Sequence, residues 1–126
     1  MAVRAPAPWL PEALSSVESQ SFENWELICV ADGADAGIQN EVQKLGSKAT
    51  YLAAPQGTGP AGCRNSALEV ARGSLTAVID ADDVWHTGHL RQHVMSFASN
   101  PDLILRGTCA TVVDSLGVAT GERIRV

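Results

Sequence analysis

Residues 26–31 of the chain, ELICVA, form a short apolar run that ends at Asp32, and residues 75–79, LTAVI, form another that ends at Asp80. Both runs are too short for a typical helix, and neither alternates strictly between apolar and polar residues. Each therefore predicts a strand that is buried on both faces, as in a parallel sheet covered by helices. These two stretches place the chain in the α/β class.

The segments around these runs carry the spacing of amphipathic helices. Within residues 9–20, Leu10, Ala13, Leu14 and Val17 fall at positions i, i+3, i+4 and i+7, which puts them on one helical face. The pattern also predicts helices over residues 36–45, 64–72 and 86–98, a strand over residues 49–53, and one or two strands within residues 102–114. Because parallel neighbours need crossover connections, this alternation predicts a parallel sheet with helices packed on it.

Composition limits the class of protein further. The chain has 126 residues, 45% of them apolar, and a net charge of −5, which fits one globular domain. Its nine Lys and Arg residues are scattered along the sequence, so nucleic acid is not an expected partner. No apolar run approaches the ~20 residues that cross a bilayer, and the first residues lack the apolar block of a signal peptide, so we expect no transmembrane segment and a cytoplasmic location.

The cysteines agree with that location. Cys29, Cys63 and Cys109 are an odd number and lie far apart, so the sequence predicts neither a disulfide framework nor a zinc site. We expect all three to be small buried thiols in a reducing compartment.

Acidic residues follow both apolar runs, at the edge where ligands collect in parallel sheets. Asp32 follows the first run, and Asp80, Asp82 and Asp83 crowd three carboxylates into the turn after the second. Their mutual repulsion favours a cation, and Mg²⁺ or Mn²⁺ suits carboxylates that share the ion with substrate phosphates. The turn thus predicts a metal that bridges to the diphosphate of a nucleotide-sugar, and an exposed acidic loop is the simpler alternative.

A second motif competes for the same residues. The stretch GTGPAG at residues 57–62 matches the G-x-G-x-x-G fingerprint of flavin- and nicotinamide-binding proteins, with Asp80 as the later acid. That fingerprint needs the first glycine to leave a strand directly, whereas Pro55 and Gln56 interrupt the chain there. An oxidoreductase fragment that binds FAD or NAD is therefore the weaker reading.

Three histidines, His86, His89 and His93, lie on one side of the helix expected at residues 86–98. At 1.5 Å per residue they spread over about 10 Å, too far for one zinc ion to contact all three. We expect a solvated helix face.

Several stretches taken together resemble the family 2 glycosyltransferases. Residues 9–17 (WLPEALSSV), 20–22 (QSF) and 25–35 (WELICVADGAD) look like the front of that family. Residues 59–83 look like its continuation, through RNSA at residue 64 and into DADD at residue 80. The resemblance runs in order over residues 8–118.

The resemblance implies a GT-A fold, a Rossmann-like parallel sheet flanked by helices, that binds a nucleotide-sugar. By it, Asp32 contacts the base, Arg64 lies near the base and phosphates, Asp80 lies near the ribose, and Asp82 coordinates Mg²⁺ or Mn²⁺. The implied reaction transfers a sugar, most simply from a UDP-sugar, with inversion to a hydroxyl of a carbohydrate or lipid-linked acceptor.

The sequence departs from the family at both ends. Residues 1–8 contain Pro6 and Pro8, so we expect an irregular arm there, the family's first strand missing, and a partial nucleotide-sugar-binding domain over residues 9–126. No residue matches the family's catalytic base, since the acids Asp114 and Glu122 have no matching motif around them. We expect the chain alone to be inactive or very weak. A non-catalytic assembly partner, whose exposed sheet edge pairs with a second chain in a homodimer, is a further alternative.

Overall fold

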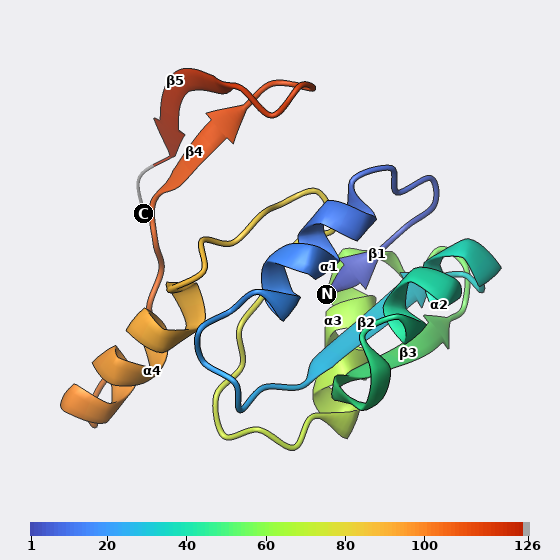
Figure 1. Ribbon diagram of the computed structural model, residues 1–126. Helices are drawn as coiled ribbons and strands as arrows, with labels where there is room; N and C mark the ends of the chain where they lie inside the picture. The colour runs from blue at the N-terminus through green and yellow to red at the C-terminus, as the bar shows by residue number, and fades with distance from the viewer. Residues whose placement is uncertain (125–126) are drawn as a thin grey trace. The chain divides into compact units, whose positions relative to one another are not determined.

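The computed structural model describes residues 1–124, which divide into two compact units, residues 1–94 and the described residues from 95 on. The first unit holds a three-stranded parallel sheet, in the order β1-β2-β3, and the second holds a two-stranded antiparallel sheet (Figure 1). The elements are β1 Ala2–Val3, α1 Leu10–Glu18, β2 Leu27–Asp32, α2 Ala36–Gln43, a 3₁₀ turn Gly46–Lys48, β3 Ala49–Ala54, α3 Gly59–Val70, α4 His89–Ser99, β4 Ala110–Val113 and β5 Ala119–Ile124.

Strand β2 is the centre of the first unit, and its two faces pack against different helices. Leu27, Cys29 and Ala31 point into a core that they share with α1 and α2. Val30 points to the opposite face, where it packs with Cys63 of α3. This alternation is the period of a strand, and it produces a helix–sheet–helix sandwich (Figure 1). The predicted α/β class and parallel sheet are confirmed.

The expected absence of a first strand is wrong. Ala2 and Val3 pair in parallel with Val30 and Ala31, and Ala2 also bridges to Asp80. The prolines that argued against a strand, Pro6 and Pro8, lie beyond the paired residues and remove no donor from this ladder. The arm is therefore irregular only after Val3.

The expected strand over residues 75–79 is also not formed. Only Asp80, just after it, makes a bridge, and the side chains of Leu75 and Val78 are 46% and 59% exposed. Ile79 alone is buried, at 3%. A two-residue β1 offers too few backbone groups for a longer ladder, so the apolar pattern does not produce a strand here.

The second unit holds the last two strands, which form a hairpin. Strand β4 lies within the region where strands were expected, and β5 follows it beyond that region. Asp114 shapes the turn, since its carboxylate accepts hydrogen bonds from the amides of Leu116 and Val118. Cys109, just before β4, is exposed, so the expectation of three buried thiols holds only for Cys29 and Cys63.

The histidine face is less solvated than expected. Helix α4 begins at His89, so His86 lies before it and is exposed. The imidazole of His89 stacks on the indole of Trp85 with 4.4 Å between ring centroids, and the ring of His93 lies 4.5 Å from that of His89. Trp85 and His89 are stacked and His93 is tilted against His89, so these rings form a partly buried cluster rather than a free polar surface.

Candidate functional site at the carboxyl edge of the sheet

The candidate residues gather where the parallel strands end. Asp32 is the last residue of β2. Asp80 is level with Val30, because both pair with Ala2, and the acidic turn that follows it runs on toward the same edge as Asp32. The topology therefore brings the two acidic segments of the sequence to one edge of the sheet.

Asp32 holds the start of α3. Its carboxylate oxygens accept hydrogen bonds from the backbone amides of Thr58, at 2.9 Å, and Gly59, at 3.3 Å. The loop reaches this position because Gly57 and Gly59 have φ angles of +85° and +75°, which side-chain-bearing residues rarely adopt. A carboxylate at a helix N-terminus is favourable for both partners, because the free amides there are positively polarised.

This arrangement argues against the dinucleotide fingerprint. In that motif the amides at the start of the helix bind a pyrophosphate. Here the amides of Thr58 and Gly59 already donate to Asp32. The GTGPAG stretch instead forms a short glycine loop up to Thr58 and the first turn of α3 from Gly59 on, and Asp32 fixes their junction in place.

Arg64 lies one turn further along α3 and reaches the acidic turn. Its guanidinium donates to Asp80 Oδ1 at 2.6 Å, with the two side chains 37% and 51% exposed. Asp80 is thus the carboxylate with which Arg64 pairs. Among residues 1–124, the buried Nε of Arg64 has no hydrogen-bond partner, so part of its donor capacity faces no acceptor from the protein.

The acidic turn carries more negative charge than Arg64 neutralises. Partial burial raises the pKa of Asp83 above its usual range, and repulsion from Asp82 and Asp80 raises it further. A cation would relieve this repulsion, so the donor set fits Mg²⁺ or Mn²⁺. In the part of the chain that the structure describes, no group of three or more His, Cys, Asp or Glu side chains forms a ready metal cage.

Two buried polar side chains hold the segment that follows the acidic turn. Ser16 lies in α1, and Gln20 lies just after the end of that helix. The Ser16 hydroxyl accepts a hydrogen bond from the Trp85 amide at 3.1 Å. The Gln20 side-chain amide donates to the carbonyl of His86 and accepts from the amide of Leu90. Gln20 is only 5% exposed, so its hydrogen bonds offset an otherwise costly burial. The turn is thus held at one end by the Asp80 bridge and at the other by α1.

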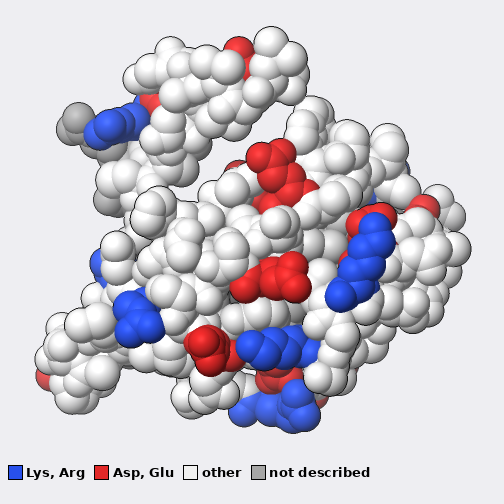
Figure 2. All heavy atoms as spheres, in the orientation of Figure 1, with Lys and Arg blue, Asp and Glu red and all other residues white. Residues whose placement is uncertain are grey.

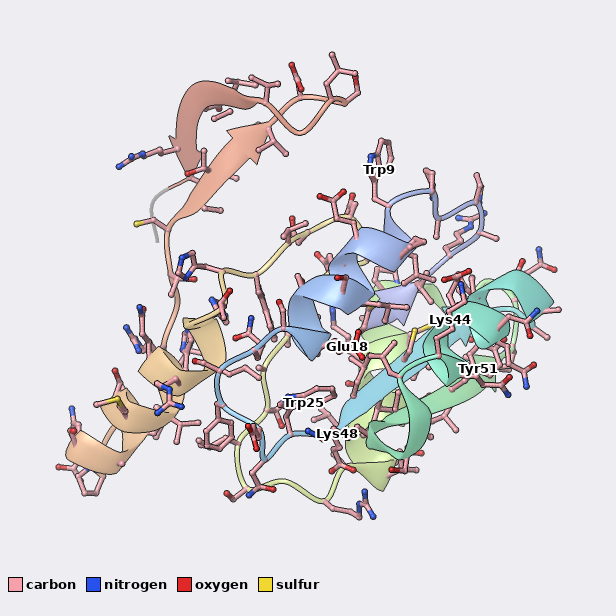
Figure 3. The ribbon with its side chains drawn as sticks, in the orientation of Figure 1. Trp9, Glu18, Trp25, Lys44, Lys48 and Tyr51 are labelled. Atoms are coloured by element: carbon pink, nitrogen blue, oxygen red, sulfur yellow. The ribbon has the colours of Figure 1, made fainter. Side chains whose placement is uncertain are left out.

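Two cavities open at this edge of the first unit. The larger, about 570 Å³, is lined by residues of the β2–α2 and β3–α3 loops, including Asp32 and Asp35. Tyr51 fixes its wall, because the phenol oxygen accepts from the Asp35 amide at 3.0 Å (Figure 3). Asp35 also caps α2 by accepting from the Ile38 amide.

The smaller cavity, about 360 Å³, contains most of the predicted site. Arg64, Asp80 and Asp82 line it together, and Trp9 forms part of its rim. The indole of Trp9 is 48% exposed and projects from the start of α1 (Figure 3). Of the four candidate residues, Asp32 therefore lines the larger cavity and the other three line the smaller one.

Sequence reasoning missed Arg4, which lines both cavities. It stands just after β1, in the arm that was expected to be irregular, and no motif marks it. Its position follows only from the pairing of Ala2 and Val3 with β2.

The surface agrees with the charge pattern of the sequence. On the face drawn in Figure 2, basic side chains stand among acidic ones and form no continuous basic area. Within the described residues, no helix is long and apolar enough to cross a membrane.

The parallel sheet with helices on both faces has the architecture of a GT-A type domain. The family model for glycosyl transferase family 2 matches residues 2–118, and the chain belongs to that family. This match does not support the flavin or nicotinamide alternative.

Its relatives are longer proteins. The chain is 33% identical over 89 residues to the Escherichia coli protein named UDP-Glc:alpha-D-GlcNAc-diphosphoundecaprenol beta-1,3-glucosyltransferase WfgD, covering 70% of this chain and 35% of that one. It is also 33% identical to the amylovoran biosynthesis glycosyltransferase AmsB of Erwinia amylovora, covering 64% of this chain and 29% of the relative. The chain thus spans about a third of the length of the curated relatives it matches.

The fold is similar to a solved structure. The crystal structure of S. aureus TarS 1-349 superposes with a TM-score of 0.72 at 21% identity, over 93% of this chain and 42% of that one. At that identity the match supports the fold alone.

Proposed function

We propose that this chain is the donor-binding part of a glycosyltransferase that moves a sugar from a nucleoside-diphosphate sugar to a hydroxyl acceptor, with inversion at the anomeric carbon. The observation that carries the proposal is the smaller cavity, where Arg64, Asp80 and Asp82 meet at the carboxyl edge of the sheet. A cationic side chain beside clustered carboxylates suits a diphosphate that is bound together with a metal ion.

In this proposal the candidate residues have separate tasks. Asp32 contacts the base and shapes the nucleoside cavity through the glycine loop. Arg64 lies near the base and phosphates and orients Asp80, which lies near the ribose. Asp82, with the Asp80 oxygen that Arg64 leaves free, would hold Mg²⁺ or Mn²⁺. When bound, that ion would supply charge stabilisation for the departing nucleoside diphosphate.

UDP is the nucleotide we propose, and a carbohydrate or lipid-linked hydroxyl is the acceptor class. The support is the name of the relative WfgD, which specifies UDP-glucose and a diphosphoundecaprenol-linked sugar. The buried thiols of Cys29 and Cys63, which form no disulfide, fit the proposed cytoplasmic location. The homodimer stays a prediction, which light scattering at several protein concentrations tests.

Isothermal titration calorimetry with UDP tests the proposal. The folded chain is expected to bind UDP more tightly with Mn²⁺ present than with EDTA, and Asp82→Ala is expected to remove that difference. Asp102→Ala, which removes an exposed acid of the second unit, serves as the charge-matched control and should bind like wild type. A folded wild-type sample that gives no heat with UDP and Mn²⁺ contradicts the assignment.

A further inference from the structure

Arg4 occupies a position in the site that no motif assigns to it. It is the one residue of the described chain that lines both cavities. The larger cavity holds Asp32 and Asp35, and the smaller holds Asp80 and Asp82, so Arg4 stands between two acidic walls.

The two arginines of the site differ in how they are engaged. The guanidinium of Arg64 is paired with Asp80 at 2.6 Å. That of Arg4 is exposed and, among residues 1–124, makes no hydrogen bond or ion pair. All the N–H donors of the Arg4 guanidinium are therefore available to a ligand, whereas one N–H group of Arg64 already donates to Asp80.

A polyanion that enters this edge meets several carboxylates, so it needs cationic partners. A nucleoside-diphosphate sugar is an elongated ligand whose charge lies in its middle, between the nucleoside and the sugar. If the nucleoside occupies the larger cavity and the sugar end approaches Asp82, the diphosphate lies at the junction of the two cavities. Arg4 is the unengaged cation at that junction, and its planar fork matches phosphate oxygens.

We propose that Arg4 is a donor-binding residue that binds the diphosphate between the two cavities. This inference rests on the proposed function and adds to it a residue outside the implied set of Asp32, Arg64, Asp80 and Asp82.

Calorimetry with two ligands tests the inference. UDP carries the diphosphate and uridine does not, and both are titrated with Mn²⁺ present. Arg4→Ala is expected to weaken UDP binding about tenfold, in the range of one exposed charge-assisted hydrogen bond, and to leave uridine binding unchanged. Arg4→Lys is expected to recover part of the affinity, because lysine restores the charge without the fork.

Arg72→Ala is the matched control. Arg72 is an exposed arginine that pairs with Glu26, beside the amino end of β2 and so at the opposite edge of the sheet. Its loss removes the same charge and should leave both affinities at the wild-type value. Thermal melting of each variant confirms that the fold is intact.

The outcomes separate the two proposals. If wild type binds UDP and Arg4→Ala binds it equally well, the role of Arg4 is wrong and the proposed function stands. If Arg4→Ala weakens uridine as much as UDP, Arg4 shapes the nucleoside cavity and the diphosphate assignment is overturned. If folded wild type binds neither ligand, the proposed function fails and the inference fails with it.

Discussion

Strand β2 and residues 75–79 have similar apolar sequences, yet only the first forms a strand. β2 lies between two neighbours, pairs through all six of its residues with β3, and buries Cys29, Val30 and Ala31 completely. Residues 75–79 pair with no strand of the described chain, since only Asp80 after them bridges to β1, and Val78 stays 59% exposed. The difference shows that an apolar run specifies a strand only where a neighbouring strand long enough to pair with it is available.

Placing a charged residue in each segment should reveal the largest difference in stability between β2 and residues 75–79. Val30→Asp buries an unpaired carboxylate between β2 and α3, and we expect it to cost at least about 3 kcal/mol and to unfold the chain. Val78→Asp adds the same charge at an exposed position and should change stability by no more than about 0.5 kcal/mol. Thermal melting followed by circular dichroism measures both. A large loss in Val78→Asp would mean that residues 75–79 are paired in solution.

The close approach of Gly62 to Thr58 at the start of α3 allows a second test, with a smaller expected effect on stability. A Cβ at Gly62 would clash with the Cγ2 methyl of Thr58. Gly62→Ala is expected to destabilise the chain by about 1–3 kcal/mol, as overpacking does. Thr58→Ser removes that methyl and should recover most of the loss in the double variant. Urea unfolding of wild type, the two single variants and the double variant gives the coupling free energy between the two positions. Additive changes in the free energy of unfolding would contradict the contact.

The two acidic segments should respond differently to neutral replacement. Asp32→Ala removes the acceptor of the Gly59 amide and one of the two acceptors of the Thr58 amide, which also donates to the Pro55 carbonyl. We expect this to cost about 1–2 kcal/mol. Asp82→Ala removes an exposed side chain and should stay within about 0.5 kcal/mol of wild type. Denaturant midpoints distinguish them. Equal stability of the two variants would show that Asp32 does not anchor the helix.

The buried thiol of Cys29 in β2 should make the stability of the chain depend on pH. Burial raises the pKa of the Cys29 thiol to about 11 from an ordinary value of 9.0. Above pH 9 the unfolded chain releases this proton while the folded chain keeps it, so stability should fall as the pH rises from 9 toward 11. Urea midpoints at pH 8 and pH 10 measure the fall, and Cys29→Ala should reduce it.

Thiol labelling checks the same burial independently. Native Cys29 should resist alkylation, whereas a cysteine introduced as Ala77→Cys in the exposed segment should react. Cys109, which is exposed, provides the internal reference for a reactive thiol. Rapid labelling of Cys29 in the folded chain would contradict the packing of β2.

The sequence predicts those parts of the molecule that depend on local patterns. The apolar run and the Asp32-Gly33 turn identify β2, and the helical period identifies α1 and α2. Family resemblance then selects Arg64 and Asp80, which the structure joins at 2.6 Å. These features need little information beyond a window of neighbouring residues.

The remainder depends on contacts between distant parts of the chain. From the sequence, Gln20 looks like a solvated residue at a helix end. It is buried only because residues 86–90 fold back against it and form hydrogen bonds with its side chain. Arg4 enters the site because β1 forms, although nearby prolines argue against a strand. The strand expected at residues 75–79 fails because its neighbour is too short.

The central claim is that a nucleoside diphosphate and a metal ion bind at the carboxyl edge of the sheet. Backbone amide NMR tests it most directly, with UDP and Mg²⁺ added first and Mn²⁺ then replacing Mg²⁺. The account predicts shifted signals at Asp32 and in the glycine loop, with paramagnetic broadening strongest at residues 80–83 and none at Glu26 beside Arg72. Broadening centred on Glu26, or scattered evenly over the chain, would contradict it.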